Sequence, residues 1–266
     1  MYRVLIATNE PNVLDGLNAS VKWQSFGFFP PAVVCTADEA IHAIETTRVD
    51  CIAYMLTSTE ARKLSHYLNT RRPSLPIFEL RRSLENQQRV LLEMRRVLDR
   101  MRTDMSDEEL DEATVLAMLR DELTHSLLAG EITDERELHG RLQMLRSHLS
   151  EDKLCVIYEF DLPQGEVYLN SQWHYGSERL ENALRSNFFG RYYEDLYYIV
   201  AVLTPRHIRL VVCQRDDTEN EPEESLVERS DGRVFQVLDN IKEYLGLDMV
   251  MTHRAVIPCL RALVVQ

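Results

Sequence analysis

The side chains of this sequence that could bind a metal or act in catalysis are scattered along the chain and do not form clusters. The five cysteines stand alone, with no Cys-x-x-Cys pair and no histidine at ligand spacing: Cys35, Cys51, Cys155, Cys213 and Cys259. A zinc site needs ligands at fixed spacing, and a disulfide framework needs paired cysteines. We therefore expect free thiols, most of them buried as small hydrophobic groups, and no metal site.

Further polar candidates lie at the ends of predicted strands in the C-terminal half. Glu159 and Asp161 close one apolar strand, His207 lies in a predicted hairpin, and His253 and Arg254 end the last strand. A metal site needs several convergent ligands, and nothing is expected to face the two acids across the hairpin. We interpret the acids as ordinary strand-end residues and the histidines as surface or hydrogen-bonded residues. The sequence has no P-loop, no Gly-x-Gly-x-x-Gly and no recognisable nucleophile elbow.

Alternating strands and helices must position the polar residues of the N-terminal half. Apolar runs predict strands at residues 2–7, 32–35, 50–56 and 75–80, and helical spacing predicts helices at 13–23, after Thr36 and at 58–70. Thr36 and Glu39 have the spacing of a capping box. This order predicts an α/β domain, a doubly wound parallel sheet with both faces covered.

From residue 83 to residue 105 the hydrophobic period becomes that of one long helix. Apolar residues step by three and four, with Gln87 as the single polar member: Leu84, Leu91, Met94, Leu98, Met101 and Met105. Such a heptad stripe can form a coiled coil that joins two chains into a homodimer. It can equally pack within its own chain, and Val90 and Val97 widen it for that purpose. Both alternatives are open on the sequence alone.

The remaining sequence predicts helices followed by an α+β domain. Ser106 and Thr133 have the context of helix caps, and four leucines are expected on the buried side of the second helix: Leu138, Leu142, Leu145 and Leu149. Strands are predicted at 154–160, 196–203, 208–214 and 248–252, with helices at 176–189 and 226–245. The expected organisation is a first domain over 1–82, a linking helix over 83–105, and a second domain over 106–266.

Composition and charge limit the possible partners. The hydrophobic fraction of 45% is that of a globular protein, and no apolar run has the ~20 residues of a membrane helix, so we expect a cytoplasmic protein without membrane contact. The net charge of −13 disfavours direct nucleic-acid binding, which draws on lysine and arginine to neutralise phosphates. The arginine-rich stretch 81–102 is expected to be the solvated face of a helix.

The order of elements over residues 2–104 resembles the receiver domain of response regulators, truncated after the fourth strand. In that family the first strand ends in acids that bind Mg²⁺, the third in the phospho-accepting aspartate, and the fourth in a threonine or serine. The corresponding residues here are Thr8, Asn9 and Glu10, then Met55, then Arg81. Phosphoryl transfer to an aspartate needs a carboxylate nucleophile and a metal clamp, and a thioether supplies neither. The resemblance implies a pseudo-receiver that cannot be phosphorylated at the usual position.

Residues 107–260 resemble the middle region of YesN-type response regulators, a degenerate diguanylate-cyclase (GGDEF-type) domain. The resemblance lies in residues 119–134, 154–161 and 244–250, while Thr204-Pro205-Arg206-His207 replaces the catalytic Gly-Gly-Asp/Glu-Glu-Phe hairpin. It implies a non-enzymatic two-component signalling protein without a cofactor, which acts through dimerisation and an unidentified protein partner. Two alternatives are a nucleotide-like small-molecule sensor, and a fragment of a transcription regulator whose AraC-like DNA-binding region is absent.

Overall fold

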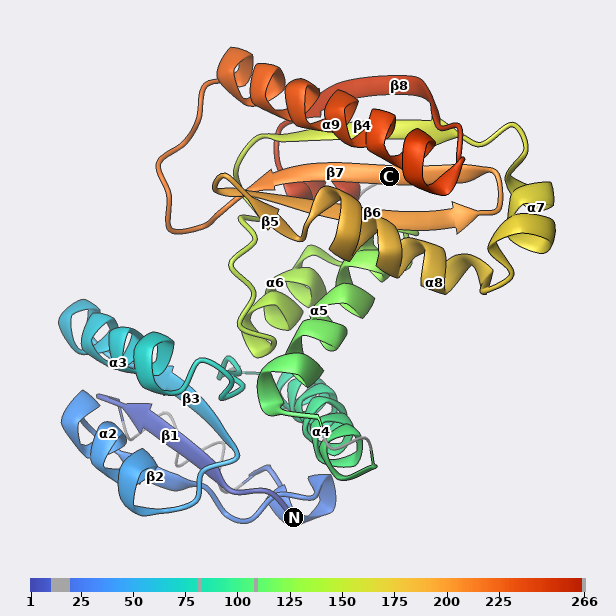
Figure 1. The fold of residues 1–266 in the computed structure, drawn as a ribbon. Coiled ribbons are helices and arrows are strands. Elements are labelled where there is room, and N and C mark those ends of the chain that lie inside the picture. Colours follow the sequence, from blue (N-terminus) through green and yellow to red (C-terminus); the bar gives the residue numbers. More distant parts are fainter. Residues whose placement is uncertain (11–19, 81–82, 108–109, 265–266) are drawn as a thin grey trace. The chain divides into compact units, whose positions relative to one another are not determined.

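The computed structural model of the chain describes residues 1–10, 20–80, 83–107 and 110–264. The chain divides into two compact units (Figure 1): unit 1 is Met1–Arg120 with Gly140–Ser147, and unit 2 is Asp121–His139 with His148–Gln266. Helices α5 (Glu112–Leu128) and α6 (Glu135–Met144) each have residues in both units. The chain therefore passes between the units at 120/121, 139/140 and 147/148.

Unit 1 contains a parallel sheet of three strands in the order β2-β1-β3, formed by β1 (Val4–Thr8), β2 (Ala32–Val34) and β3 (Cys51–Met55). The strand predicted at 75–80 is reduced to a single parallel bridge between Ile77 and Ile52. Its two hydrogen bonds run from Ile52 N–H to the Pro76 carbonyl and from Phe78 N–H to the Ile52 carbonyl, both at 3.0 Å. Because Pro76 has no N–H to donate, it cannot contribute fully to a ladder.

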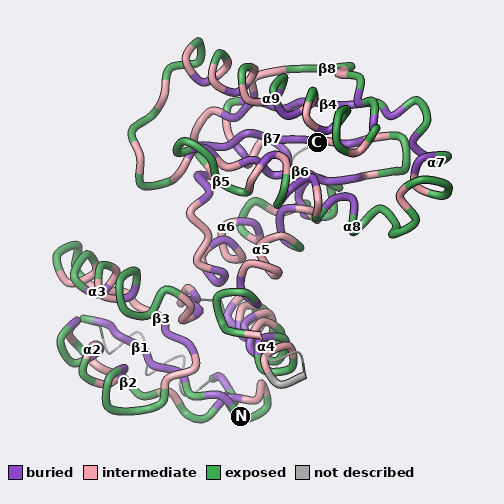
Figure 2. Tube along the Cα trace, in the orientation of Figure 1, coloured by how far each residue is buried: buried purple, intermediate pink, exposed green. Residues whose placement is uncertain are grey.

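Helices cover both faces of this sheet, as the alternating pattern predicts. On one face, α2 (Ala37–Thr46) and α3 (Ser58–Arg71) pack around Leu5 and Ile52. On the other face, α4 (Leu84–Asp107) packs with the short helix η1 (Trp23–Phe26) against Val4 and Ile6. Figure 2 shows the resulting burial along β1. Most of the helix predicted at 13–23 lies outside the described residues.

Helix α4 belongs to the core of unit 1 and is not a separate linker. Leu91, Met94, Leu98 and Met101 are 0%, 0%, 5% and 7% exposed, whereas Leu84 is 41% exposed; Met105 is half-buried. Leu91, Met94 and Leu98 pack in the same cluster as the sheet. In the structure these four buried residues therefore pack within their own chain. Side chains that are already covered in this way are not exposed for a coiled coil with a second chain.

Two predicted helix starts are wrong by a few residues. No helix begins directly after Ser106, because α4 continues through Asp107. At the start of α5 the Asp111 carboxylate accepts the backbone N–H three residues on, at 2.7 Å. Likewise Asp134, not Thr133, accepts a backbone N–H at the start of α6, at 2.9 Å. In both places an aspartate at the true helix start takes the capping role.

Unit 2 contains a five-stranded antiparallel sheet in the order β5-β6-β7-β4-β8. Its strands are β4 (Cys155–Asp161), β5 (Tyr192–Tyr193), β6 (Leu196–Thr204), β7 (His207–Gln214) and β8 (Val250–Ile257). Its other helices are α7 (Gly165–Tyr168), η2 (Leu169–Trp173), α8 (Gly176–Ala183), η3 (Leu184–Phe189), α9 (Glu223–Leu245) and η4 (Leu260–Leu263). The main elements follow the order β-α-β-β-α-β.

The predicted elements of this half are present, with β8 beginning two residues later than predicted and extending to Ile257. Alternate residues of β4, β6 and β7 pack under α8, η3 and α9 on one face of the sheet (Figures 1 and 2). From the other face Arg209 donates to the carbonyl of Leu128, the last residue of α5, at 2.7 Å. The sheet is thus held on both sides, and the leucines predicted to be buried around α6 are buried.

Candidate functional site

The predicted strand-end positions of unit 1 meet at the carboxyl edge of the parallel sheet. Thr8 and Met55, the last residues of β1 and β3, lie opposite each other in register. The backbone N–H of Asn9 donates to the Met55 carbonyl at 3.3 Å, and Thr8 is fully buried. The structure therefore brings Thr8, Asn9, Glu10 and Met55 to one edge, while Arg81 lies outside the described residues.

Asn9 ties together the segments that follow all three strands. Its side-chain amide donates to the carbonyl of Cys35, after β2, at 2.7 Å. Its side-chain oxygen accepts the backbone N–H of Thr57, after β3, at 2.7 Å. The Thr8 hydroxyl oxygen accepts the Glu10 N–H at 3.0 Å. The Asn9 side chain and the Thr8 hydroxyl are thus occupied with neutral hydrogen bonds that fix the backbone.

Carboxylates near this edge serve the start of α2. The capping box is confirmed, since Thr36 accepts the Glu39 N–H at 3.2 Å, and Glu39 in turn accepts the Cys35 N–H at 2.8 Å. Glu60, from α3, accepts the Ala37 N–H at 2.6 Å. Acids at a helix N-terminus are stabilised by the helix dipole and its unpaired N–H groups. Sequence reasoning missed Glu60 because its partner is 23 residues away and no local pattern marks it.

In unit 2 the sequence interpretation of Glu159 is wrong in one respect, because basic residues do face it. Its carboxylate accepts a hydrogen bond from Arg209 at 2.8 Å and lies 2.6 Å from the Nε2 atom of His207. On its other side His253 of β8 is opposite Glu159 in register. A metal ion at this strand end would have to displace the guanidinium group, while Asp161 is exposed. Glu159 is therefore an ion-paired residue near the end of its strand.

The hairpin between β6 and β7 is closed against the segment after β4. A Cβ atom on Gly165 would lie 1.8 Å from the carbonyl oxygen of Pro205, so only glycine permits this approach. The Leu162 N–H donates to the Arg206 carbonyl at 2.9 Å, which fastens the same two segments. Backbone therefore fills the space between the hairpin and the end of β4.

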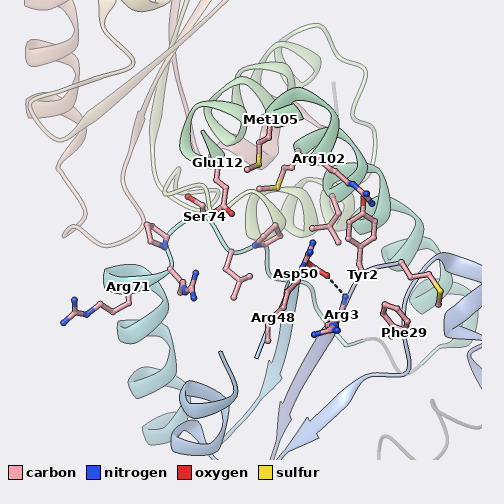
Figure 3. A pocket seen from close by; sticks show the side chains of 18 residues that line it. Tyr2, Arg3, Phe29, Arg48, Asp50, Arg71, Ser74, Arg102, Met105 and Glu112 are labelled. Atoms are coloured by element: carbon pink, nitrogen blue, oxygen red, sulfur yellow. Dashed lines mark hydrogen bonds and ion pairs between the residues drawn. The ribbon is translucent and has the colours of Figure 1, made fainter. Parts of the chain in front are cut away.

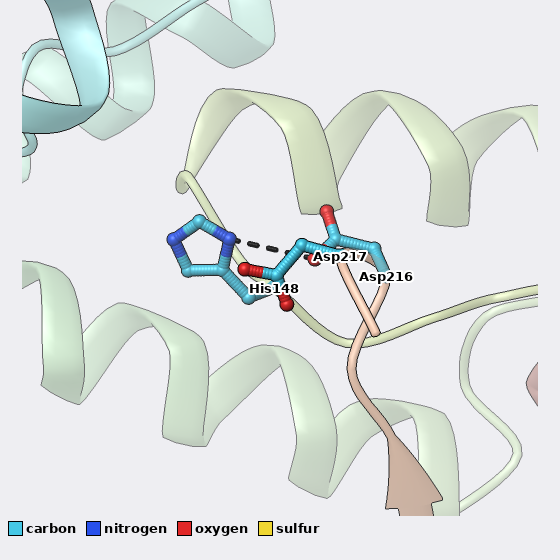
Figure 4. Close-up of side chains that lie close together, drawn as sticks. All are labelled: His148, Asp216 and Asp217. Atoms are coloured by element: carbon cyan, nitrogen blue, oxygen red, sulfur yellow. Dashed lines mark ion pairs between the residues drawn. The ribbon is translucent and has the colours of Figure 1, made fainter. Parts of the chain in front are cut away.

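A histidine and two aspartates lie close together elsewhere in unit 2 (Figure 4). The candidate ligand atoms of His148, Asp216 and Asp217 lie within 4.8 Å of one another. These residue types can bind a divalent metal. Asp217, however, forms an ion pair with Arg215, whose hydrogen bond lowers the pKa of that carboxyl. The Asp216 N–H donates to the His148 carbonyl at 3.0 Å, a long-range contact that the sequence did not reveal.

Comparison with known proteins adds no identification. Neither the protein-family models nor the curated proteins include a match to this chain. Across the described ranges, no helix combines the length and the apolar character needed to cross a membrane.

Proposed function

We propose that this chain is a non-enzymatic regulatory protein of signal transduction, in which unit 1 is a pseudo-receiver and unit 2 a degenerate GGDEF-like domain. The observation that carries the proposal is the carboxyl edge of the sheet in unit 1. Met55 lies at the end of β3, opposite Thr8. The side chain of the adjacent Asn9 is hydrogen-bonded to two backbone groups. This edge retains the converging strand ends of a site, but the end of β3 carries the Met55 thioether in place of the carboxylate that a phosphoryl acceptor needs.

The geometry of unit 2 favours the same kind of function. Its β-α-β-β-α-β order is compatible with a cyclase-like ancestry. The segment after β4 presses on the hairpin at Gly165, and Glu159 is engaged by Arg209. Nucleotide turnover needs open space and free metal-binding acids at such a strand end. These contacts therefore weigh against catalysis there, and also against a nucleotide sensor at that same place.

The proposed output is contact with a protein partner. Pairing of two chains through α4 stays a prediction, and for Leu91, Met94, Leu98 and Met101 it would require the helix to leave its own core. A regulatory protein of this kind needs no cofactor, since binding alone can shift the activity of a partner.

A phosphotransfer assay tests the proposal. The chain is incubated with radiolabelled acetyl phosphate and Mg²⁺, next to a phosphorylatable receiver domain as positive control. We expect label on the control and none on this chain. A Met55→Asp variant should also stay unlabelled, because Thr8 and Asn9 leave Glu10 as the one acid among the positions that would bind the metal. Stoichiometric labelling of the unaltered chain would overturn the proposal, whether the label is stable or labile in acid.

A further inference from the structure

Unit 1 has a cavity at the amino ends of its strands, opposite the edge that carries Asn9 and Met55. Its volume is about 630 Å³, within the range of small-molecule sites. Arg3, Arg48 and Asp50, which line it, precede β1 and β3, whereas Arg102 and Met105 come from α4 (Figure 3). The amino edge of the sheet thus faces a hollow that the sequence-predicted site does not use.

Positive charge dominates the lining of this cavity. It contains five arginines, Arg3, Arg48, Arg71, Arg72 and Arg102, against two carboxylates, Asp50 and Glu112. Such a concentration is notable in a chain whose net charge is −13. Like charges gathered in one hollow repel one another, and a bound anion relieves that repulsion.

Part of this charge is already balanced and part is not. Asp50 accepts the backbone N–H of Arg3 at 2.7 Å and the Nε–H of Arg48 at 2.8 Å. Within the described residues, the guanidinium groups of Arg3, Arg71 and Arg72 form no hydrogen bond or ion pair, and all three residues are exposed. Guanidinium groups bind phosphate oxygens in a bidentate manner. Figure 3 shows the Arg71 side chain directed away from the other labelled lining residues, so Arg3 and Arg72 are the natural anion ligands.

The inner wall of the cavity is apolar. Leu98 and Met101 of α4 line it and are buried, and Leu75 and Pro76 contribute from the segment that follows α3. Methionine side chains adapt their shape to a bound group. A simple inorganic anion would leave this wall unused, whereas a planar or apolar body attached to the anion would cover it.

We infer that this cavity binds a small organic phosphate, with the phosphate on Arg3 and Arg72 and the organic body against Leu98 and Met101. The inference does not rest on the proposed function, because it concerns the opposite edge of the sheet. It would give unit 1 a sensing role that needs no phosphoryl acceptor.

Calorimetry and thermal unfolding of the full chain test this with three probes at equal ionic strength: ATP without Mg²⁺, pyrophosphate and adenosine. We expect ATP to bind and to raise Tm with concentration, since a ligand that binds only the folded state stabilises it. ATP should bind more tightly than either of its parts. Equal binding of pyrophosphate would overturn the role of the apolar wall, and no heat or Tm shift with ATP would overturn the whole inference.

Variants locate the binding. Arg3→Ala and Arg72→Ala, on separate segments, should each weaken ATP binding about tenfold, the usual loss for one charged hydrogen-bonding group. Arg62→Ala is the matched control, because Arg62 lies on α3 outside the cavity and bonds to the Ser58 carbonyl of its own helix. Full ATP affinity in both cavity variants would place the binding elsewhere and overturn the inference. Phosphotransfer labelling and ATP binding are measured separately, so the proposed function can fail while this inference stands, and the reverse.

Discussion

The hydroxyl group of Tyr2 donates a hydrogen bond of 2.6 Å to Asp99, a residue 97 positions away on α4. Tyr2 also packs in the core with Leu91 and Leu98. The bond therefore joins the start of the chain to the long helix. Burial, with a further contribution from Asp99, raises the pKa of Tyr2 from 10.0 to about 12.

Removal of this bond should weaken unit 1. We expect Tyr2→Phe to lower the free energy of unfolding by about 1 kcal/mol, since the ring is kept and one hydrogen bond is lost. Trp23 lies in unit 1 and Trp173 in unit 2, so variants that keep one tryptophan report on one unit in urea unfolding. Tyr244→Phe is the control, because Tyr244 is 72% exposed. Equal effects of the two changes would contradict the assigned role of Tyr2.

The same bond predicts a pH dependence. The folded-state pKa of Tyr2 is about 12, above the ordinary value of 10.0. Its contribution to stability is therefore complete below pH 10 and is lost as the pH rises through 12. The stability difference between the unaltered chain and Tyr2→Phe should shrink across this interval, as measured by urea unfolding at each pH. A constant difference would show that the hydroxyl does not titrate as a buried group.

Replacement of Asn9 by aspartate, which has nearly the same shape, should destabilise unit 1. Asn9→Asp keeps an acceptor for Thr57 but places a carboxylate oxygen against the Cys35 carbonyl. We expect a loss of about 1–2 kcal/mol in unfolding free energy at pH 7. The loss should shrink as the pH falls from 7 toward about 4 and be smallest below that, where the new carboxyl is protonated and can donate. Asn9→Ala serves as the comparison, because its loss should not depend on pH. The same pH response in both variants would contradict the bonding described at this edge.

Gly165 should be intolerant of any side chain. Gly165→Ala brings a methyl group against the Pro205 carbonyl, and we expect a loss of about 1–3 kcal/mol or more from unit 2. Gly232, inside α9, has no atom within 4 Å of the position of an added Cβ. Gly232→Ala should stabilise by about 0.5–1 kcal/mol through helix propensity. Equal stability of the two variants in thermal unfolding would show that the hairpin does not press on Gly165.

Neighbouring leucines on α4 separate intrachain packing from dimerisation. Leu91 is fully buried, whereas Leu92 is 48% exposed. We expect Leu91→Ala to cost about 2–5 kcal/mol in unfolding free energy. Leu92→Ala should stay within about 0.5 kcal/mol. Light scattering should give the same mass for both variants as for the unaltered chain. A folded Leu91→Ala variant that changes from dimer to monomer would instead support the coiled coil.

Local patterns predicted most elements of the fold, because hydrophobic period and helix caps are short-range signals. The strand at 75–80 failed because Pro76 removes a donor, a restriction that the apolar run concealed. The caps at Ser106 and Thr133 failed because aspartates closer to the true helix starts took the role.

The sites were predicted less well than the elements. Thr8 and Met55 could be placed together, since parallel strands end at one edge. The basic partners of Glu159 were missed because strand register decides which residue faces it. The arginine-lined cavity could not be seen in the sequence, since its arginines come from four separate segments and share no spacing.

Because the chain crosses between the units three times, the two units cannot both be kept complete by one cut in the gene. Met144, the last residue of α6, is buried in the core of unit 1 together with Tyr2 and Phe28. A single break anywhere between residues 112 and 148 therefore leaves at least one unit without a piece of its own structure. Recombination at one junction can transfer one unit intact, at 120/121 or 147/148, only by leaving the other unit incomplete, so the chain has no single junction that separates two complete units.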